Sequence, residues 1–153
     1  MAAPLDDAAR LAAARNFSDA VPHNRALGIR PIAMSAGEAC FELPYHPQLV
    51  GNPDTGVLHG GAITSLLDAA SGAAVFATLE KWAPIATLDL RIDYLRQAEP
   101  ARDVRCRATC YKMTRNVAFT RAIAYHDDEA DPIASSVGTF MLGTKLGGFK
   151  GPT

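Results

Sequence analysis

The sequence predicts an α+β fold in which one antiparallel sheet wraps around a long central helix. Two observations lead to this expectation. The longest apolar stretch of the chain, residues 60–79, has the periodicity of a helix, and four segments with strand-like alternation follow it. A sheet that curls over a single helix buries the apolar sides of both most economically.

The composition is that of a globular protein without a strong net charge. The 153 residues include 15 Lys and Arg against 16 Asp and Glu, and 48% are hydrophobic. A formal net charge of -1 gives no general attraction to nucleic acid or to anionic membranes, so we expect neither as a partner. The length suits one main domain over 24–146, with an N-terminal helical extension (1–23) and a flexible tail (147–153).

The cysteines indicate a reducing compartment. Cys40, Cys106 and Cys110 do not form a paired framework, and the last two would lie too far apart on one strand for a bridge. Reduced thiols are typical of the cytoplasm, which is the location we expect. The N-terminal segment contains Asp6 and Asp7 and lacks an apolar core, so we expect no signal peptide.

The chain before the central helix is predicted to contain two helical segments and a β-hairpin. The first helical segment is rich in alanine, and the second is expected to stop at Gly28. A loop dense in proline and glycine then leads into the central helix, a common place for binding groups. The expected helical segments are 5–19 and 21–27, and the expected strands are 29–34 and 38–43.

The central helix, 60–79, has two different faces. Its apolar stripe suits packing on a sheet and consists of Ile63, Leu66, Leu67, Ala70, Ala74 and Ala77. Its second stripe is small and polar, which suits close approach by a ligand or another chain, and consists of Gly61, Thr64, Ser65, Asp68, Ser71 and Gly72. The stretch is long enough to cross a membrane, but Asp68 and its small polar neighbours argue against a membrane span.

Four strands are expected after the helix, at 85–95, 104–112, 117–126 and 133–142. Simple alternation places Thr87 and Tyr94 on opposite sides of the first strand. In the third strand it gives one apolar face, made of Val117, Phe119, Ile123 and Tyr125. A sheet of this kind leaves an edge to be covered, so we expect the chain to form a homo-oligomer.

Asp68 is the single charge within the apolar stretch. An enclosed carboxylate costs several kcal/mol, roughly, unless a partner compensates it. We interpret it as a catalytic carboxylate, which could attack directly or take a proton from water. The structural alternative is a carboxylate satisfied by hydrogen bonds across a helix pair at a dimer axis.

The turn His59-Gly60-Gly61 opens the helix. Backbone amides at a helix N-terminus favour developing negative charge, and glycine permits close approach to them. We therefore expect the amides of Gly60 and Gly61 to polarise a carbonyl, although the glycines could simply form a tight turn. For His59 we favour a hydrogen bond that fixes the turn over acid–base catalysis. We find no cluster of residues at metal-ligand spacing and expect no metal or other cofactor.

These elements together resemble a known family. The matching segments are Gly56 to Gly61, Asp68 at seven residues beyond Gly61, the strand from Thr87 to Arg96, and the turn Lys112 to Phe119. Over residues 24–143 the chain resembles the hotdog-fold acyl-CoA thioesterases of the phenylacetate-degradation and 4-hydroxybenzoyl-CoA thioesterase type.

The resemblance implies hydrolysis of an acyl-CoA to a free carboxylic acid and coenzyme A. It implies a dimer or a dimer of dimers, with the thioester held between subunits. Asp68 would be the nucleophile or the general base, and Gly60 and Gly61 would hold the thioester oxygen. Thr87, contributed by the neighbouring subunit, would orient water, but threonine is also an ordinary strand residue.

Further site residues follow from the same resemblance. Related enzymes commonly place a polar residue where this chain has Pro53, so Asn52 or Asp54 would have to serve in its place. The residues expected to bind coenzyme A, unless they are merely solvated strand ends, are Arg96, Lys112, Arg115 and Asn116. Two other functions remain open on this fold, a non-catalytic acyl-CoA binder and a hydratase or dehydratase.

Overall fold

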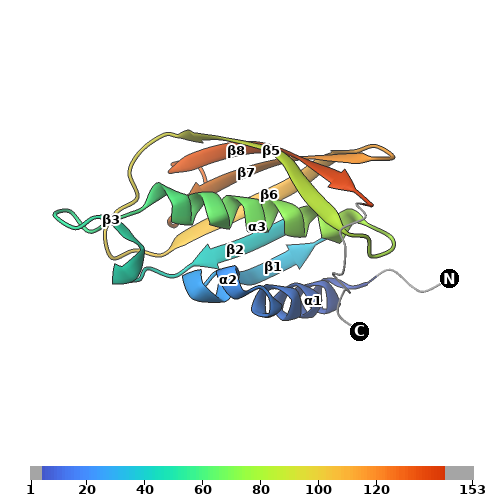
Figure 1. The fold of residues 1–153 in the computed structure, drawn as a ribbon, viewed down its shortest axis with the longest axis horizontal. Coiled ribbons are helices and arrows are strands. Elements are labelled where there is room, and N and C mark those ends of the chain that lie inside the picture. The colour runs from blue at the N-terminus through green and yellow to red at the C-terminus, as the bar shows by residue number, and fades with distance from the viewer. Residues whose placement is uncertain (1–4, 144–153) are drawn as a thin grey trace.

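A computed structural model describes residues 5–143 and contains one six-stranded antiparallel sheet whose one face is covered by helix α3 (Figure 1). The strand order is β1-β2-β6-β7-β8-β5, so β1 and β5 form the two edges. The expected α+β fold with a sheet around a central helix is confirmed. The strands are β1 (Arg30–Ser35), β2 (Glu38–Leu43), β5 (Ile85–Tyr94), β6 (Val104–Met113), β7 (Val117–Tyr125) and β8 (Ala134–Leu142).

The N-terminal segment forms two helices, α1 (Asp7–Ala20) and α2 (Pro22–Leu27). As expected, α2 ends at Gly28, whose φ of 74° is left-handed and therefore suits glycine. Helix α1 lies beside β1, along the lower edge of the sheet in Figure 1. The expected tail, 147–153, lies outside the described residues.

Helix α3 (Gly60–Thr78) packs its apolar stripe against the sheet. Leu66, Leu67, Ala70 and Ala74 are fully buried, and Ile63 is 3% exposed. The helix is long and apolar enough to meet the length and composition criteria for a membrane span. Its place under the sheet explains that composition, because a core helix needs the same apolar residues.

Strand β5 departs from simple alternation. Its register against β8 shifts between Thr87 and Asp89, where Thr87 pairs with Phe140 and Leu90 with Gly138. One extra residue in a strand reverses the facing of every residue beyond it. The expectation that Thr87 and Tyr94 lie on opposite sides is therefore wrong, and both face α3.

Strand β7 alternates as expected, but its bulky apolar face is not the one that packs on α3. The residues that contribute to the buried core are Ala118, Ala122 and Ala124, with the buried Thr120 in the same alternation. The bulkier set beginning with Val117 and Phe119 lies on the outer face of the sheet. Alanines fit here because α3 is itself rich in small residues, so that helix and sheet approach closely.

The loop before α3 contains a short 3₁₀ helix (Pro47–Leu49) and a small hairpin, β3 (Val50–Asn52) and β4 (Val57–Leu58). This hairpin packs directly against the start of α3. The Leu49 carbonyl accepts a 2.8 Å hydrogen bond from the His59 amide, and a Cβ atom on Gly51 would lie 2.8 Å from His59 Cα. The hairpin thereby sets the position of the His-Gly-Gly turn.

Candidate active site

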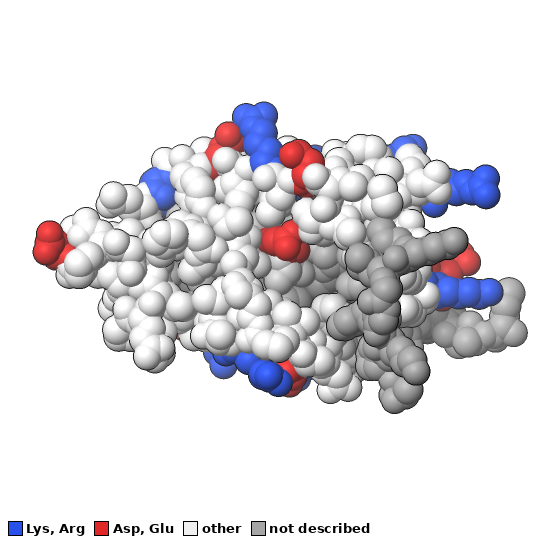
Figure 2. Space-filling model, viewed as in Figure 1, with Lys and Arg blue, Asp and Glu red and all other residues white. Residues whose placement is uncertain are grey.

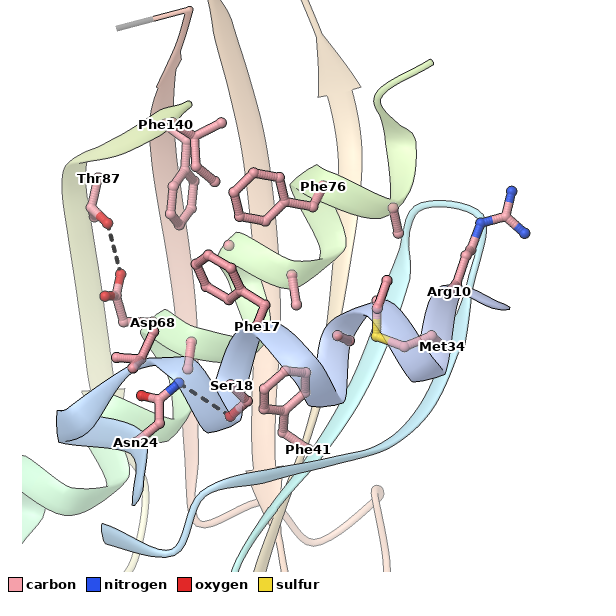
Figure 3. Close-up of a pocket in the computed structure, with 18 of the residues that line it drawn as sticks. Arg10, Phe17, Ser18, Asn24, Met34, Phe41, Asp68, Phe76, Thr87 and Phe140 are labelled. Carbon is pink, nitrogen blue, oxygen red and sulfur yellow. Dashed lines mark hydrogen bonds between the residues drawn. The ribbon is translucent and has the colours of Figure 1, made fainter. Parts of the chain in front are cut away.

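A cavity of about 450 Å³ lies between the N-terminal helices and α3 (Figure 3). Asp68 and Thr87 line one end of it. Its walls are mostly apolar, and the larger residues in them are Phe17, Met34, Phe41, Phe76, Trp82 and Phe140. Figure 2 shows the molecule from the same side as Figure 1, and most of the charged side chains visible on this face lie along its rims. Such a cavity suits an apolar group whose reactive end meets a carboxylate.

Asp68 is partly exposed and holds one hydrogen bond among residues 5–143. Thr87 Oγ1 donates to Asp68 Oδ1 over 2.9 Å (Figure 3). The resemblance implied that Thr87 arrives from a neighbouring subunit, but this contact forms within one chain. The register shift in β5 turns Thr87 toward α3 and so makes the contact possible. The structural alternative, a carboxylate that is hydrogen-bonded across a helix pair at a dimer axis, requires a second chain and is not tested by the contacts within one chain.

His59 caps α3, as the favoured interpretation expected. Its Nδ1 accepts a 2.8 Å hydrogen bond from the Gly61 amide. A capping side chain of this kind satisfies one of the unpaired amides in the first turn. The Gly61 amide is therefore already bonded to a protein side chain. Of the two glycine amides expected to polarise a carbonyl, this leaves that of Gly60.

Gly60 provides the remaining amide. Its N–H has no hydrogen-bond partner among the described residues, whereas its carbonyl accepts from Tyr94 Oη over 2.7 Å and from Thr64 Oγ1 over 3.1 Å. The contact of Tyr94 was missed in the sequence, because alternation placed it opposite Thr87 and nothing local indicates that it reaches the first turn of α3. The Gly60 N–H can thus donate to an oxygen from outside the described residues.

Two residues from the N-terminal helices, Ser18 and Asn24, were also missed. Both are buried and line the cavity. Asn24 Nδ2 donates to Ser18 Oγ over 3.3 Å, and Ser18 Oγ donates to the Ile29 carbonyl over 3.2 Å. The segment that looked like an extension therefore builds one wall of the site.

Asn52 and Asp54 do not line the cavity. The Asn52 side chain accepts a 3.0 Å hydrogen bond from the Asp54 amide, and its carbonyl accepts from the Gly56 amide. Asn52 is thus used to close its own exposed turn, a common role for asparagine. Within one chain, the loop does not bulge to bring either residue to Asp68.

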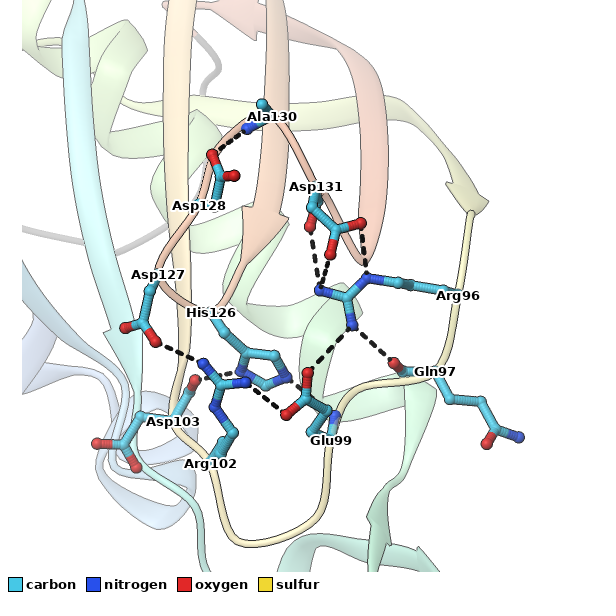
Figure 4. Close-up of polar contacts among 10 residues, drawn as sticks. All are labelled: Arg96, Gln97, Glu99, Arg102, Asp103, His126, Asp127, Asp128, Ala130 and Asp131. Atoms are coloured by element: carbon cyan, nitrogen blue, oxygen red, sulfur yellow. Dashed lines mark hydrogen bonds and ion pairs between the residues drawn. The ribbon is translucent and has the colours of Figure 1, made fainter.

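The expected coenzyme A residues do not form one patch within the chain. Arg96 pairs with Asp131 and Glu99, in a network that continues to Arg102 and Asp127 (Figure 4). The other three residues, Lys112, Arg115 and Asn116, lie at the opposite end of the sheet. There the Leu142 amide, at the end of β8, donates a hydrogen bond to the Asn116 carbonyl. Strand length puts the two groups roughly 25 Å apart. Lys112 and Arg115 are exposed and form no ion pair within residues 5–143.

The cysteines are free, which agrees with the absence of a paired framework among them. Burial raises the pKa of both the Cys40 and the Cys106 thiols, so they remain protonated and poorly nucleophilic. The part of the chain that the structure describes holds no group of three His, Cys, Asp or Glu residues able to bind a metal ion. Asp68 is therefore the best candidate for the reactive group at this cavity.

Comparison with known proteins identifies the family of the chain. A family model described as the Thioesterase superfamily matches residues 55–133, which include the His-Gly-Gly turn, Asp68 and β5. The Escherichia coli protein YigI, named a medium/long-chain acyl-CoA thioesterase, is 36% identical over 138 residues, covering 80% of this chain and 86% of YigI.

Solved structures give the same result. A Pseudomonas aeruginosa protein of known crystal structure is 45% identical, with a TM-score of 0.79, covering 86% of this chain and 98% of that protein. A variant of the phenylacetic acid degradation protein PaaI from Thermus thermophilus is 26% identical, with a TM-score of 0.69, covering 79% of this chain and 98% of PaaI. The chain belongs to the thioesterase superfamily and has the hotdog fold of that group. It is accordingly an enzyme of the thioester hydrolase class.

Proposed function

We propose that the protein hydrolyses acyl-CoA thioesters to a free carboxylic acid and coenzyme A, with the reaction centred on Asp68. The observation that carries this proposal is a partly exposed carboxylate at one end of an apolar cavity, on a helix whose first amide has no partner among residues 5–143. The name of the relative YigI, a medium/long-chain acyl-CoA thioesterase, points to the same substrate class.

The groups around Asp68 suit thioester hydrolysis. Thr87 holds one carboxylate oxygen, which leaves the other available to take a proton from water. The resulting hydroxyl adds to the acyl carbon, and the carbonyl oxygen becomes an oxyanion that a helix-start amide such as that of Gly60 can stabilise. Because Gly60 and Asp68 lie roughly 12 Å apart along α3, this amide would come from the second chain of a pair. When the C–S bond breaks, the thiolate leaves and the acid is formed. Direct attack by the carboxylate oxygen is the alternative route to the same products.

The cavity suits an aliphatic acyl group. Its aromatic walls come from both α1 and α3, where Phe17 and Phe76 pack at a ring-centroid distance of 5.5 Å. A volume of about 450 Å³ lies in the range of small-molecule sites. We therefore propose medium to long acyl chains as substrates, lying between Phe17 and Phe140 with the thioester at Asp68.

Lys112 and Arg115 are the better candidates for the coenzyme A phosphates. They lie at the end of the sheet where β5 begins, the end nearer to Thr87, and their charges are not used in ion pairs within residues 5–143. Arg96 suits this role less well, because Asp131 and Glu99 already balance its charge. Asn116, in the same turn as Arg115, could add a hydrogen bond.

We propose that two chains pair through β5. This strand is 10 residues long, lies at the edge of the sheet and is mostly exposed. A long free edge is normally covered, and pairing of two copies would place the site beside the subunit boundary. The free thiols fit the reducing cytoplasm as the location.

The direct test is a thiol-release assay on a panel of acyl-CoAs from short to long chains, together with an aromatic acyl-CoA. We expect release of coenzyme A and free acid, fastest with medium or long aliphatic chains. Binding of acyl-CoA in calorimetry without thiol release would instead indicate a non-catalytic binder. Formation or hydration of an enoyl product would indicate a hydratase or dehydratase.

The chain-length preference gives a sharper prediction. Replacing Phe17 with alanine enlarges the cavity, so the ratio of kcat/KM for long over short acyl chains should rise by about 10-fold. Phe17→Trp should lower the same ratio, because the larger ring shortens the space. Phe119→Ala, on the outer face of β7, is the matched control and should leave the ratio unchanged. An unchanged ratio in both Phe17 variants would exclude this cavity as the acyl site.

A further inference from the structure

Side chains of strand β5 form hydrogen bonds with α3 at two places, and the mechanism above uses only one of them. Thr87 binds Asp68, whereas Tyr94, at the other end of the strand, binds the first turn of the helix. The Tyr94 hydroxyl lies 2.7 Å from the Gly60 carbonyl oxygen and 2.7 Å from Thr64 Oγ1, and Thr64 Oγ1 lies 3.1 Å from the same carbonyl. Two hydroxyl hydrogens serve these three contacts, so at least one of them always binds the Gly60 carbonyl.

This contact fixes the turn from the side opposite to His59. The Gly60 carbonyl and the Gly61 N–H belong to one peptide plane. His59 Nδ1 holds its N–H end, and Tyr94 with Thr64 holds its carbonyl end. A peptide held at both ends cannot rotate freely, and the neighbouring Gly60 N–H is held with it.

We propose that Tyr94 is a positioning residue for the reaction, which holds the His-Gly-Gly turn so that the Gly60 N–H points at the thioester oxygen. This inference rests on the proposed function for its effect on rate. A preorganised donor stabilises the transition state more than the bound substrate, because charge on the oxygen develops only during reaction. Loss of the Tyr94 hydroxyl should therefore lower kcat and leave KM nearly unchanged.

Space around the turn supports the same role. A Cβ atom on Gly60 would lie 3.3 Å from Tyr94 Oη, which shows how closely the ring packs on this backbone. Tyr94 is half exposed, with 50% of its surface accessible, so its hydroxyl does not contribute to core packing. Removing that hydroxyl should therefore leave the fold intact and lower Tm only slightly.

The test compares Tyr94→Phe with Tyr111→Phe. Tyr111 is 49% exposed and lies on β6, away from the turn, so it is a matched control for the chemical change. We expect Tyr94→Phe to lower kcat by about 10-fold with KM within about 2-fold, and the control to behave as the unchanged enzyme. Thr64→Val, which removes the second hydroxyl, should give a smaller loss in the same direction.

A second measurement separates this proposal from the proposed function. The amide resonance of Gly60 in NMR spectra should shift in Tyr94→Phe and not in Tyr111→Phe, whether or not a substrate is turned over. If the unchanged enzyme releases no thiol from any acyl-CoA, the proposed function fails while the NMR comparison still decides whether Tyr94 holds the turn. Unchanged kcat in Tyr94→Phe, or an unchanged Gly60 resonance, would overturn the proposal.

Discussion

Asp68→Asn is expected to lower kcat for acyl-CoA hydrolysis by about 1000-fold or more, with little change in KM. The amide keeps the shape of the side chain and can still accept from Thr87, so binding and folding should persist. What it loses is the basic oxygen that takes the proton from water or attacks the acyl carbon. An interaction used only in the transition state appears in kcat rather than in KM.

The matched control is Asp89→Asn, on an exposed part of the same strand as Thr87. It should retain full activity, and neither variant should lower Tm by more than a few degrees. Single turnover in ¹⁸O-water then separates the two routes. General base catalysis puts the label into the free acid, whereas direct attack, followed by water addition to the Asp68 carbonyl, leaves it in the enzyme. Asp68→Asn with more than a tenth of normal kcat would remove the carboxylate from the mechanism.

Most of the fold could be predicted from the sequence because its elements have strong local patterns. The four later strands and α3 were placed within a residue or two of their observed ends. The errors concern faces rather than elements. The extra residue between Thr87 and Asp89 has no sequence signal, yet it reverses the second half of β5. In β7 the small alanines face the core, which depends on how closely α3 approaches.

The candidate site was predictable only where it is local. Asp68 and the turn at His59 belong to one helix, so local patterns were enough to single out both, although roughly 13 Å of helix separates them. Tyr94 and Phe17 reach the site from elements far away in the chain, and nothing local marks them. The ion pair of Arg96 could not be predicted, because its partner Asp131 lies 35 residues further along the chain and comes close only in the folded sheet.

Gly51→Ala is expected to damage both stability and activity, although Gly51 is exposed and does not line the cavity. An added Cβ atom would lie 2.8 Å from His59 Cα and 3.2 Å from His59 N. Neither atom can move without moving the backbone, so the β3–β4 hairpin and the start of α3 must separate. We expect a loss of about 1–3 kcal/mol in stability, as for other overpacked sites. The His59 to Leu49 backbone hydrogen bond should weaken with it.

The same displacement should reduce kcat by about 100-fold, because a shift of roughly 1 Å in a reacting group has that effect. The matched control is Gly72→Ala in α3, where the new Cβ atom would lie at an ordinary 3.7 Å from Ile85 and Phe140. Since alanine favours a helix over glycine, that variant should raise Tm. Thermal unfolding and kcat of both variants provide the comparison. If Gly51→Ala matches the unchanged enzyme in both, the hairpin does not set the position of the Gly60 amide, and the turn must be held by α3 and Tyr94 alone.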